Sequence, residues 1–314
     1  MAAPPEWVYP GRELMLYSIL LSHLLDVVYP FHTGILLSLH PVHTSYVMSL
    51  RLAPPFSSRM RGVLVWFVVV VVHIALYSLI LYAAWSISRF LWLLASSWIL
   101  KTSFSLRLLL ETVSGVGARL DGGDVWGARR LVSGIVRRDV RELGPGHVAS
   151  AALESLAESM VDGYVSPLFY ALALGPLGAL LQRLANTLDG SLGYKTPEYR
   201  DVGWFSARMD TVLNYVPARL TALLLILLSP IALGDPRRAW MVWRRDASAT
   251  DSVNAGHPMS AMAGALGVRL EKKGYYKLGE GPLPGPLHVR LGLRLAVAAA
   301  LAWLSICIIV LSLL

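Results

Sequence analysis

The sequence has few charged residues and almost no cysteine. Of its 314 residues, 15% are Lys, Arg, Asp or Glu, whereas soluble domains carry about 25%. The single cysteine, Cys307, excludes a disulfide framework or a cysteine-based metal site within one chain. No basic region precedes the first apolar stretch, so we expect no cleaved signal peptide. With 55% apolar residues and a mean hydropathy of +0.55, the composition excludes disordered, collagen-like and coiled-coil classes and predicts an integral membrane protein.

Long apolar segments are the most prominent feature that is present. A hydrocarbon core about 30 Å thick is crossed by about 20 mostly apolar helical residues. The clearest candidate segments are residues 62–85, 212–233 and 295–314. Weaker candidates are residues 14–29, 90–100 and 164–184, of which the second is long enough only if it extends to residue 110. The sequence therefore predicts an all-α, polytopic integral membrane protein with about five transmembrane helices (four to six), arranged as a single membrane-embedded catalytic domain over residues 1–314.

Two polar segments separate the apolar ones. Residues 101–163 predict a polar helical insert of three amphipathic helices, which the turn-forming DGGD at 121–124 and GPG at 144–146 interrupt. Residues 234–290 predict a basic loop that leads into a C-terminal transmembrane helix at 295–314. The net charge is +8, and the positive-inside rule places both segments in the cytoplasm of a multi-pass cell-membrane protein.

Three carboxylates within the polar insert share a helical spacing. Glu154, Glu158 and Asp162 lie at i, i+4 and i+8, which aligns them along one stripe of a helix. Like charges at this spacing repel each other, so we expect a cationic group to face them. Carboxylates that share a face suit Mg²⁺ or a Mg-nucleotide, because Mg²⁺ binds one or two carboxylates together with substrate phosphates. The alternative is a solvated helix face.

A second block, residues 186–220, concentrates polar residues in a short loop and the start of an apolar helix. Arg208, Tyr215 and Arg219 are predicted to share one helical face, and Asp210 and Asn214 another. Guanidinium groups suit phosphate and carboxylate oxygens, so this block predicts an anion clamp. The alternative is that Arg219 snorkels to the membrane surface. The polar residues of the block are Asn186, Asp189, Lys195, Arg200, Arg208, Asp210, Asn214 and Arg219.

A third block, residues 244–270, contains Asp246, Asn254 and His257. The glycine-bearing turn at 254–258 feeds a small-residue helix, whose first N–H groups can face an anion. By itself such a turn is weak evidence for a site. His40 follows a candidate span that contains Asp26, and we interpret it as a packed or solvated side chain. Walker A, GxSxG and HExxH motifs are absent, and the basic residues flank membrane segments, so nucleic acid is not an expected partner.

Several short motifs recur in the order and spacing of one known family. They are Lys101-Thr102-Ser103, Glu154-Ser155-Leu156-Ala157-Glu158, Asp162-Gly163, Asn186-Thr187-Leu188-Asp189, Ala207-Arg208, Asp210, Asn214, Pro217-Ala218-Arg219, Arg245-Asp246, Asn254-Ala255-Gly256 and Ala261-Met262-Ala263-Gly264. By these motifs, over residues 100 to 270, the sequence resembles the membrane-bound adenosylcobinamide-phosphate synthases of cobalamin biosynthesis. Three features depart from the family pattern: a Gly-Asp-Pro near the start is blurred, Ser252-Val253 stands where Ser-Pro is usual, and Met259 stands where an acid often follows Pro258.

The resemblance implies a reaction, its cofactors and its partners. Adenosylcobyric acid would be joined to (R)-1-aminopropan-2-yl phosphate, or to ethanolamine phosphate, with Mg²⁺ and ATP and through an acyl phosphate. The implied metal ligands are Glu154, Glu158 and Asp162, and the catalytic candidates are Asp189, Lys195, Arg208 and Asp210. The implied substrate-binding residues are Asn186, Arg200, Asn214, Arg219, Asp246, Asn254 and His257. Besides these substrates and the lipid bilayer, a homo-oligomer or other membrane proteins of cobalamin assembly are the implied partners.

Two alternatives and one topological conflict stay open. A transporter or anion-permeation protein would also place Asp189, Arg208 and Arg219 in the membrane, and a corrinoid-binding scaffold is a third reading. If residues 164–184 and 212–233 both span the bilayer, the loop between them faces away from the other two polar blocks. Breaks at Pro167, Gly175-Pro176 and Gly178 favour a re-entrant or protein-buried segment instead.

Overall fold

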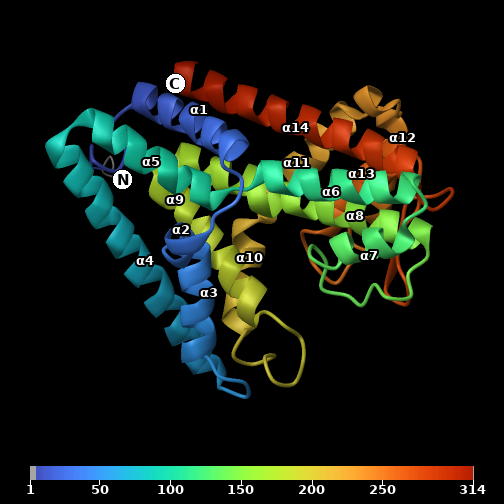
Figure 1. Ribbon diagram of the computed structural model, residues 1–314, viewed down its shortest axis with the longest axis horizontal. Helices are drawn as coiled ribbons and strands as arrows, with labels where there is room; N and C mark the ends of the chain where they lie inside the picture. The colour runs from blue at the N-terminus through green and yellow to red at the C-terminus, as the bar shows by residue number, and fades with distance from the viewer. Residues whose placement is uncertain (1–4, 314) are drawn as a thin grey trace. The chain divides into compact units, whose positions relative to one another are not determined.

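The computed structural model describes residues 5–313, in which almost all of the regular secondary structure is helical. The one sheet among them is a small antiparallel hairpin of β1 (Leu270–Lys272) and β2 (Tyr276–Leu278), in which Leu270 pairs with Leu278. The chain divides into two compact units (Figure 1). Among the described residues, unit 1 contains 5–105, 166–213 and 306–313, and unit 2 contains 106–165 and 214–305. The all-α prediction is confirmed.

Unit 1 is built around α5 and α9, which pack against each other. The helix α1 also packs on α5, while α3, α4 and α10 pack on α9. Ser88 alone separates α4 from α5 and caps α5, since its side chain accepts a hydrogen bond from Leu91 N–H. The helices are α1 (Arg12–Val28), α2 (Gly34–Ser38), α3 (Pro41–Leu52), α4 (Arg59–Ile87), α5 (Arg89–Ser103), α9 (Ser166–Leu192) and α10 (Trp204–Leu213).

Unit 2 is centred on α13, which packs against α11, α12 and α8. The small residues of α13 make this close packing feasible, because a Cβ at Gly264 would lie 2.7 Å from Ala239 Cα of α12. The helical elements are α6 (Leu106–Asp121), α7 (Val125–Val132), α8 (Pro145–Met160), the π-helical turn η1 (Val161–Val165), α11 (Tyr215–Leu227), the 3₁₀ turn η2 (Ser229–Ala232), α12 (Pro236–Asp246), α13 (Gly256–Leu266) and α14 (Pro286–Leu313), which belongs to unit 2 up to Ser305.

The protein is a multi-pass membrane protein by the length and composition of its helices. Four helical stretches are long and apolar enough to cross a bilayer, namely Arg59–Ile87, Arg89–Asp121, Pro145–Leu192 and Pro286–Leu313. A fifth is added if α10 and α11 count as one bent span, so the expected range of four to six is confirmed. The helix at 12–28 does not meet this test in the described chain. The other predicted spans correspond to helices that are longer than the apolar segments. These helices continue into polar residues, which a hydropathy analysis does not include in a span.

The predicted breaks of the polar insert are confirmed, and they separate the helices α6, α7 and α8. The turn after Asp121 leads to Asp124, which caps α7 by accepting the Gly127 N–H at 2.8 Å. Pro145 then begins α8. The basic segment 234–290 is more than a loop, because it holds α12, α13, the hairpin and the start of α14. Arg290 in that start pairs with Asp121 at 3.1 Å.

The predicted break at Gly175-Pro176 is confirmed within α9. Gly175 has φ 71° and ψ −165°, and a Cβ there would lie 2.7 Å from the Val8 carbonyl oxygen. We expect Gly175→Ala to destabilise the protein by about 1–3 kcal/mol, because L-residues avoid this backbone region. Denaturation by SDS in mixed micelles measures the change. The matched control is Gly122→Ala, whose added methyl would meet its nearest atom at 3.6 Å; equal losses in both variants would contradict the prediction.

Candidate active site

Glu154 lies in the middle of α8 and is buried, with 5% of its surface exposed. Hydrogen-bond donors of the protein surround its carboxylate. Its Oε1 accepts hydrogen bonds from Arg138 Nη2 at 3.1 Å and Ser150 Oγ at 2.6 Å. Its Oε2 accepts one from the Tyr276 hydroxyl at 2.7 Å and lies 3.1 Å from Arg138 Nη1. Arg138 therefore contacts both oxygens as a fork. We call these four residues the Glu154 network. The cation predicted to face the acidic stripe is present at Glu154.

The Glu154 network joins the β-hairpin to α8. Ser150 Oγ also accepts the Glu271 backbone N–H at 2.8 Å. Burial and then the negative charge of Glu154 raise the pKa of Tyr276, so its phenol stays protonated and donates. Sequence reasoning missed Tyr276. The signal for its hairpin is Gly274, which has φ 76° between the two strands and suits a tight turn.

Glu158 and Asp162 lie in different surroundings from Glu154. Glu158 is exposed one turn further along α8. The α-helix ends at Met160, and Asp162 is half-buried in the π-helical turn η1. Because a π turn closes i→i+5 bonds, the regular i, i+4, i+8 stripe does not continue to Asp162. Within residues 5–313, no three His, Cys, Asp or Glu side chains form a group that could hold a metal ion. The metal assignment stays a prediction.

Three of the predicted substrate-binding residues lie together in unit 2. Arg219 Nη1 in α11 donates to Asn254 Oδ1 at 3.2 Å and to the Tyr215 carbonyl oxygen at 2.6 Å. Trp243 Nε1 in α12 donates to His257 Nδ1, in the first turn of α13, at 2.9 Å. Burial, and then the positive charge of Arg219, lowers the pKa of His257 to about 4. We call Arg219, Trp243, Asn254 and His257 the Arg219 cluster.

Asp246 is engaged by the protein instead of pointing toward open space. Its two carboxylate oxygens accept hydrogen bonds from Arg245 at 2.6 and 2.9 Å, and Oδ2 accepts the Gly279 N–H at 2.7 Å. Burial raises the pKa of Asp246, but these hydrogen bonds outweigh burial and the net shift is downward. Arg245 in turn pairs with Glu280. Asp246 therefore ties α12 to the segment after the hairpin, and its predicted role in substrate binding has no support in this geometry.

Comparison with known proteins identifies the family. A family model described as "CobD/Cbib protein" matches residues 19–290. The chain belongs to this family. It is 48% identical over 300 residues to the probable cobalamin biosynthesis protein CobD of Aeropyrum pernix, covering 94% of each chain. It is 40% identical over 234 residues to the cobalamin biosynthesis protein CobD of Chromobacterium violaceum, covering 71% of this chain and 73% of the other. No solved structure matches the chain.

Membership of the CobD/Cbib family places the chain among cobalamin biosynthesis proteins. The family match includes every predicted site residue, because all of them lie between residues 154 and 257. The comparisons assign no role to any of these residues. Their arrangement in each unit is therefore described from the structure alone.

Unit 1 of this CobD/Cbib family member holds the second polar block. Asn186 in α9 accepts a hydrogen bond from Arg183 Nη1 at 3.3 Å and donates one to Asp210 Oδ1 of α10 at 3.2 Å. Asp189, one turn further along α9, lies close to Gly193, where a Cβ would sit 2.0 Å from Asp189 Oδ1. The structure thus joins Asn186 to Asp210 by a hydrogen bond. The Asp189 carboxylate can occupy its position because residue 193 is a glycine, which has no Cβ.

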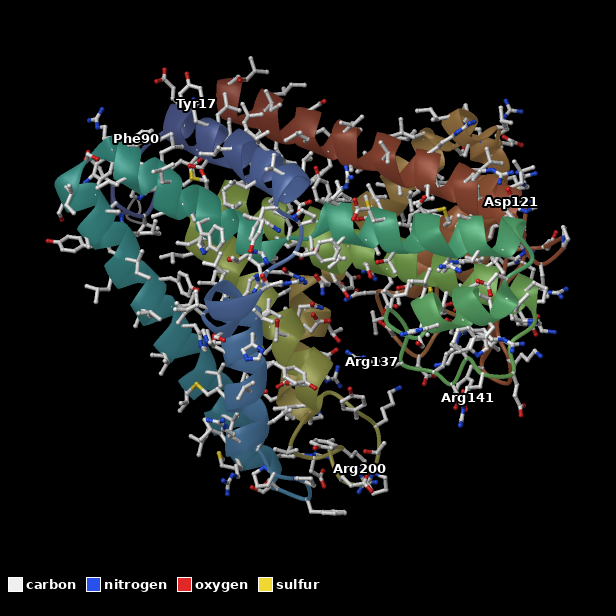
Figure 2. All side chains as sticks on the ribbon, viewed as in Figure 1. Tyr17, Phe90, Asp121, Arg137, Arg141 and Arg200 are labelled. Carbon is white, nitrogen blue, oxygen red and sulfur yellow. The ribbon has the colours of Figure 1, made fainter. Side chains whose placement is uncertain are left out.

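The structure corrects the start of the loop in this block. The sequence prediction placed Asn186 and Asp189 in a loop, but α9 continues to Leu192, so both are helical. Lys195 and Arg200 lie in the true loop and are exposed. Arg200 is labelled on this loop in Figure 2. The hydropathy of this segment did not predict that the helix extends this far, because only one face of it is apolar. The residues of that face are spaced four apart, and their packing stabilises the helix. That face is formed by the buried Leu184, Leu188 and Leu192.

The predicted helical face is confirmed for Tyr215 and Arg219, which contact each other in α11, but Arg208 lies in a different helix. The helix α10 ends at Leu213 and α11 begins at Tyr215. Between them the buried Asn214 has φ −87° and ψ −1°, which lies in the bridge region. Arg208 is exposed in unit 1, whereas Arg219 belongs to unit 2. Because the helix is interrupted at Asn214, a helical period of 3.6 residues counted across it does not predict which side chains share a face.

Unit 1 also buries an ion pair at the C-terminal end of α5. Lys101 Nζ lies 3.1 Å from Asp26 Oδ1, and the two side chains are 2% and 4% exposed. Nearby, His40 Nδ1 accepts the Val42 N–H at 3.2 Å and caps α3. Burial, and then neighbouring cationic and histidine side chains, lowers the pKa of His40 to about 3. The interpretation of His40 as a packed side chain is confirmed, whereas Lys101 is a core residue instead of the start of a polar insert.

Proposed function

We propose that this protein joins the free propionate of adenosylcobyric acid to the amine of (R)-1-aminopropan-2-yl phosphate, or of ethanolamine phosphate, in an ATP-dependent amide ligation. The observation that carries the proposal is the Arg219 cluster, where side chains of α11, α12 and α13 gather. Guanidinium and imidazole N–H groups bind phosphate or carboxylate oxygens, which each of these substrates carries. The identity of the substrates rests on the family resemblance and on the relatives' names.

The reaction requires an activated carboxylate and a deprotonated amine. ATP, when bound with Mg²⁺, supplies the phosphoryl group that makes a carboxylate oxygen a leaving group. Arg219 and His257 would hold negatively charged oxygens and stabilise charge that develops on them. The proton that the attacking amine loses needs a general base, and Asp189 and Asp210 of unit 1 are the candidates that the family resemblance implies for this role. The exposed Lys195, Arg200 and Arg208 give the surface of unit 1 positive charge.

Glu158 and Asp162 fit Mg²⁺ better than Glu154 does. Mg²⁺ takes one or two protein carboxylates and completes its shell with phosphates and water. Glu158 is exposed, and Asp162 lies in a π turn, a feature frequent at functional sites. Glu154 already accepts hydrogen bonds from Arg138, Ser150 and Tyr276. In this proposal Glu154 positions α8 and the hairpin, and Glu158 and Asp162 hold the metal.

Turnover by the detergent-purified protein tests the proposed function. Adenosylcobyric acid, aminopropanol phosphate and Mg-ATP are supplied together and in all combinations that omit one of them, and the corrinoid product is weighed by mass spectrometry. Product that requires all three additions supports the ligase. If folded protein forms no product with either amino-alcohol phosphate, the proposal fails and the transporter or anion-permeation alternative takes its place.

Glu158→Gln is expected to lower kcat by about 10-fold or more and to raise the Mg²⁺ concentration needed for half-maximal rate. The amide keeps the size of the side chain but removes the charge that attracts the metal. Rates measured across a Mg²⁺ titration separate the two effects. Glu111→Gln, which neutralises another exposed acid of unit 2, is the control and should behave as the parent protein. An unchanged Mg²⁺ dependence in Glu158→Gln would remove Glu158 from the metal site.

The proposal also predicts the membrane side of the loop after α9. ATP is cytoplasmic, so we expect a cysteine at the exposed Thr196 to be shielded from an impermeant maleimide in sealed cells and labelled after permeabilisation. The native Cys307 is buried, which keeps the background low. Tyr275→Cys, at an exposed position between the hairpin strands, is the cytoplasmic control. Labelling of Thr196→Cys in sealed cells would show that residues 164–184 cross the bilayer instead of re-entering.

A further inference from the structure

The hydrogen bond between Trp243 and His257 determines where the imidazole carries its proton. An indole N–H can only donate, and Trp243 Nε1 lies 2.9 Å from His257 Nδ1. Nδ1 must therefore be the accepting nitrogen, without a proton of its own. In the neutral ring the proton then sits on Nε2. This tautomer follows from the chemistry of the partner.

The surroundings keep this imidazole neutral near pH 7. Burial, and then the nearby Arg219 guanidinium, lowers the pKa of His257 to about 4. Trp243 of α12 cannot offset this effect, because its indole carries no charge. His257 is consequently a neutral donor through Nε2 across the physiological range. It is not available as a general base at Nδ1, because that nitrogen accepts the indole proton.

Arg219 is held in place through one edge of its guanidinium. Nη1 donates to the Tyr215 carbonyl oxygen at 2.6 Å and to Asn254 Oδ1 at 3.2 Å. The guanidinium carbon lies 3.5 Å from the centroid of the Tyr215 ring, a cation–π distance. These contacts fix the plane of the group and leave the N–H groups of Nε and Nη2 with no hydrogen-bond acceptor among residues 5–313.

We propose that Trp243 is a positioning residue that presents His257 Nε2–H beside Arg219 as a donor-only clamp for a phosphate monoester, the phosphate of the amino-alcohol substrate. This assignment rests on the proposed function for the identity of that substrate. A site that offers N–H donors and one permanent positive charge favours a dianionic phosphate over a neutral alcohol, because charge-assisted hydrogen bonds are stronger than neutral ones. The clamp therefore accounts for selection of the phosphorylated amino alcohol over the free one.

Two substitutions at position 257 test whether the N–H donor at Nε2 is needed, or only a polar side chain at this position. The amide nitrogen of His257→Gln reaches roughly as far as Nε2 and keeps a donor there, whereas the shorter His257→Asn does not. We expect His257→Asn to raise KM for aminopropanol phosphate by about 10-fold or more, with KM for ATP unchanged. His257→Gln should stay within about threefold of the parent protein. Equal KM values in the two variants would overturn the clamp, and a rise confined to ATP would show that the nucleotide is bound there instead.

Trp243→Phe tests the positioning role with a readout independent of turnover. In protein labelled with ¹⁵N-histidine, the resonances of His257, assigned by their loss in His257→Gln, should show a protonated Nε2 and an unprotonated Nδ1. Phenylalanine removes the indole donor, so the second tautomer should become detectable and KM for aminopropanol phosphate should rise several-fold. An unchanged tautomer in Trp243→Phe would remove Trp243 from this role.

Titration with inorganic phosphate distinguishes failure of the clamp from failure of the proposed function. Phosphate should shift the His257 Nε2 resonance in the parent protein at concentrations where acetate does not, and Arg219→Gln should abolish the shift. If phosphate binds but no amide product forms, the clamp stands and the ligase assignment fails. If product forms but phosphate leaves His257 unaffected, the ligase assignment stands and the clamp fails.

Discussion

Replacing Lys101 with methionine is expected to destabilise the protein by about 3–5 kcal/mol, because it leaves the buried Asp26 carboxylate without its cation. The Lys101 ammonium lies 3.1 Å from Asp26 Oδ1, and both side chains are almost fully removed from solvent. Methionine preserves the length and much of the apolar stem, so the loss reports the charge and not a cavity. SDS denaturation in mixed micelles, followed by far-UV circular dichroism, gives the change.

The double variant Lys101→Met/Asp26→Leu is the matched control for this prediction. Removing both charges eliminates the carboxylate that Lys101→Met deprives of its ammonium group, and buried ion pairs are often replaceable by apolar residues at little net cost. We therefore expect the double variant to recover most of the stability that Lys101→Met loses. If the double variant loses as much unfolding free energy as the two single variants lose together, the two charges act independently. The ion pair would then not explain the burial of Lys101.

Replacing Arg138 with methionine is expected to have the second large effect, a loss of about 3–5 kcal/mol together with most of the turnover. Glu154 would keep Ser150 and Tyr276 as donors but would lose the guanidinium that contacts both of its oxygens. Arg138→Lys should recover only part of the loss, because an ammonium cannot reproduce the planar fork. Tyr276→Phe removes one hydrogen bond to a charged group and should cost about 1.5–3 kcal/mol.

A double-mutant cycle decides whether the loss arises at Glu154. Arg138→Met/Glu154→Gln should be more stable than Arg138→Met alone, since the amide needs no counterion. Repeating the measurement with and without Mg²⁺ separates a structural acid from a metal ligand. The stability change of Glu154→Gln should not depend on Mg²⁺. A Mg²⁺-dependent change would return Glu154 to the metal site and contradict its role in joining α8 to the hairpin.

The candidate site could be predicted from sequence only where its signals are local. Arg219, Asn254 and His257 were identified as substrate-binding residues, and the structure places them together. Trp243 could not be predicted from local signals. The residues next to a tryptophan do not show that its N–H group donates to a histidine 14 residues away. Tyr276 likewise reaches Glu154 across 122 residues. A partner at such separation depends on how helices pack, which periodicity does not encode.

What the sequence by itself determined is the helical membrane class, a range of four to six apolar spans, the breaks at 121–124, 144–146 and Gly175-Pro176, and the family. Each of these depends on hydropathy, on backbone preferences of Gly and Pro, or on ordered motifs, all of which act over a few neighbouring residues. Only the tertiary structure decided that α9 runs to Leu192, that Asn214 interrupts the helix between Arg208 and Arg219, and that Glu154 and Asp246 are saturated by protein donors. The physical reason is that a buried polar group must find its hydrogen-bond partner in space, and that partner is brought near by packing between distant parts of the chain.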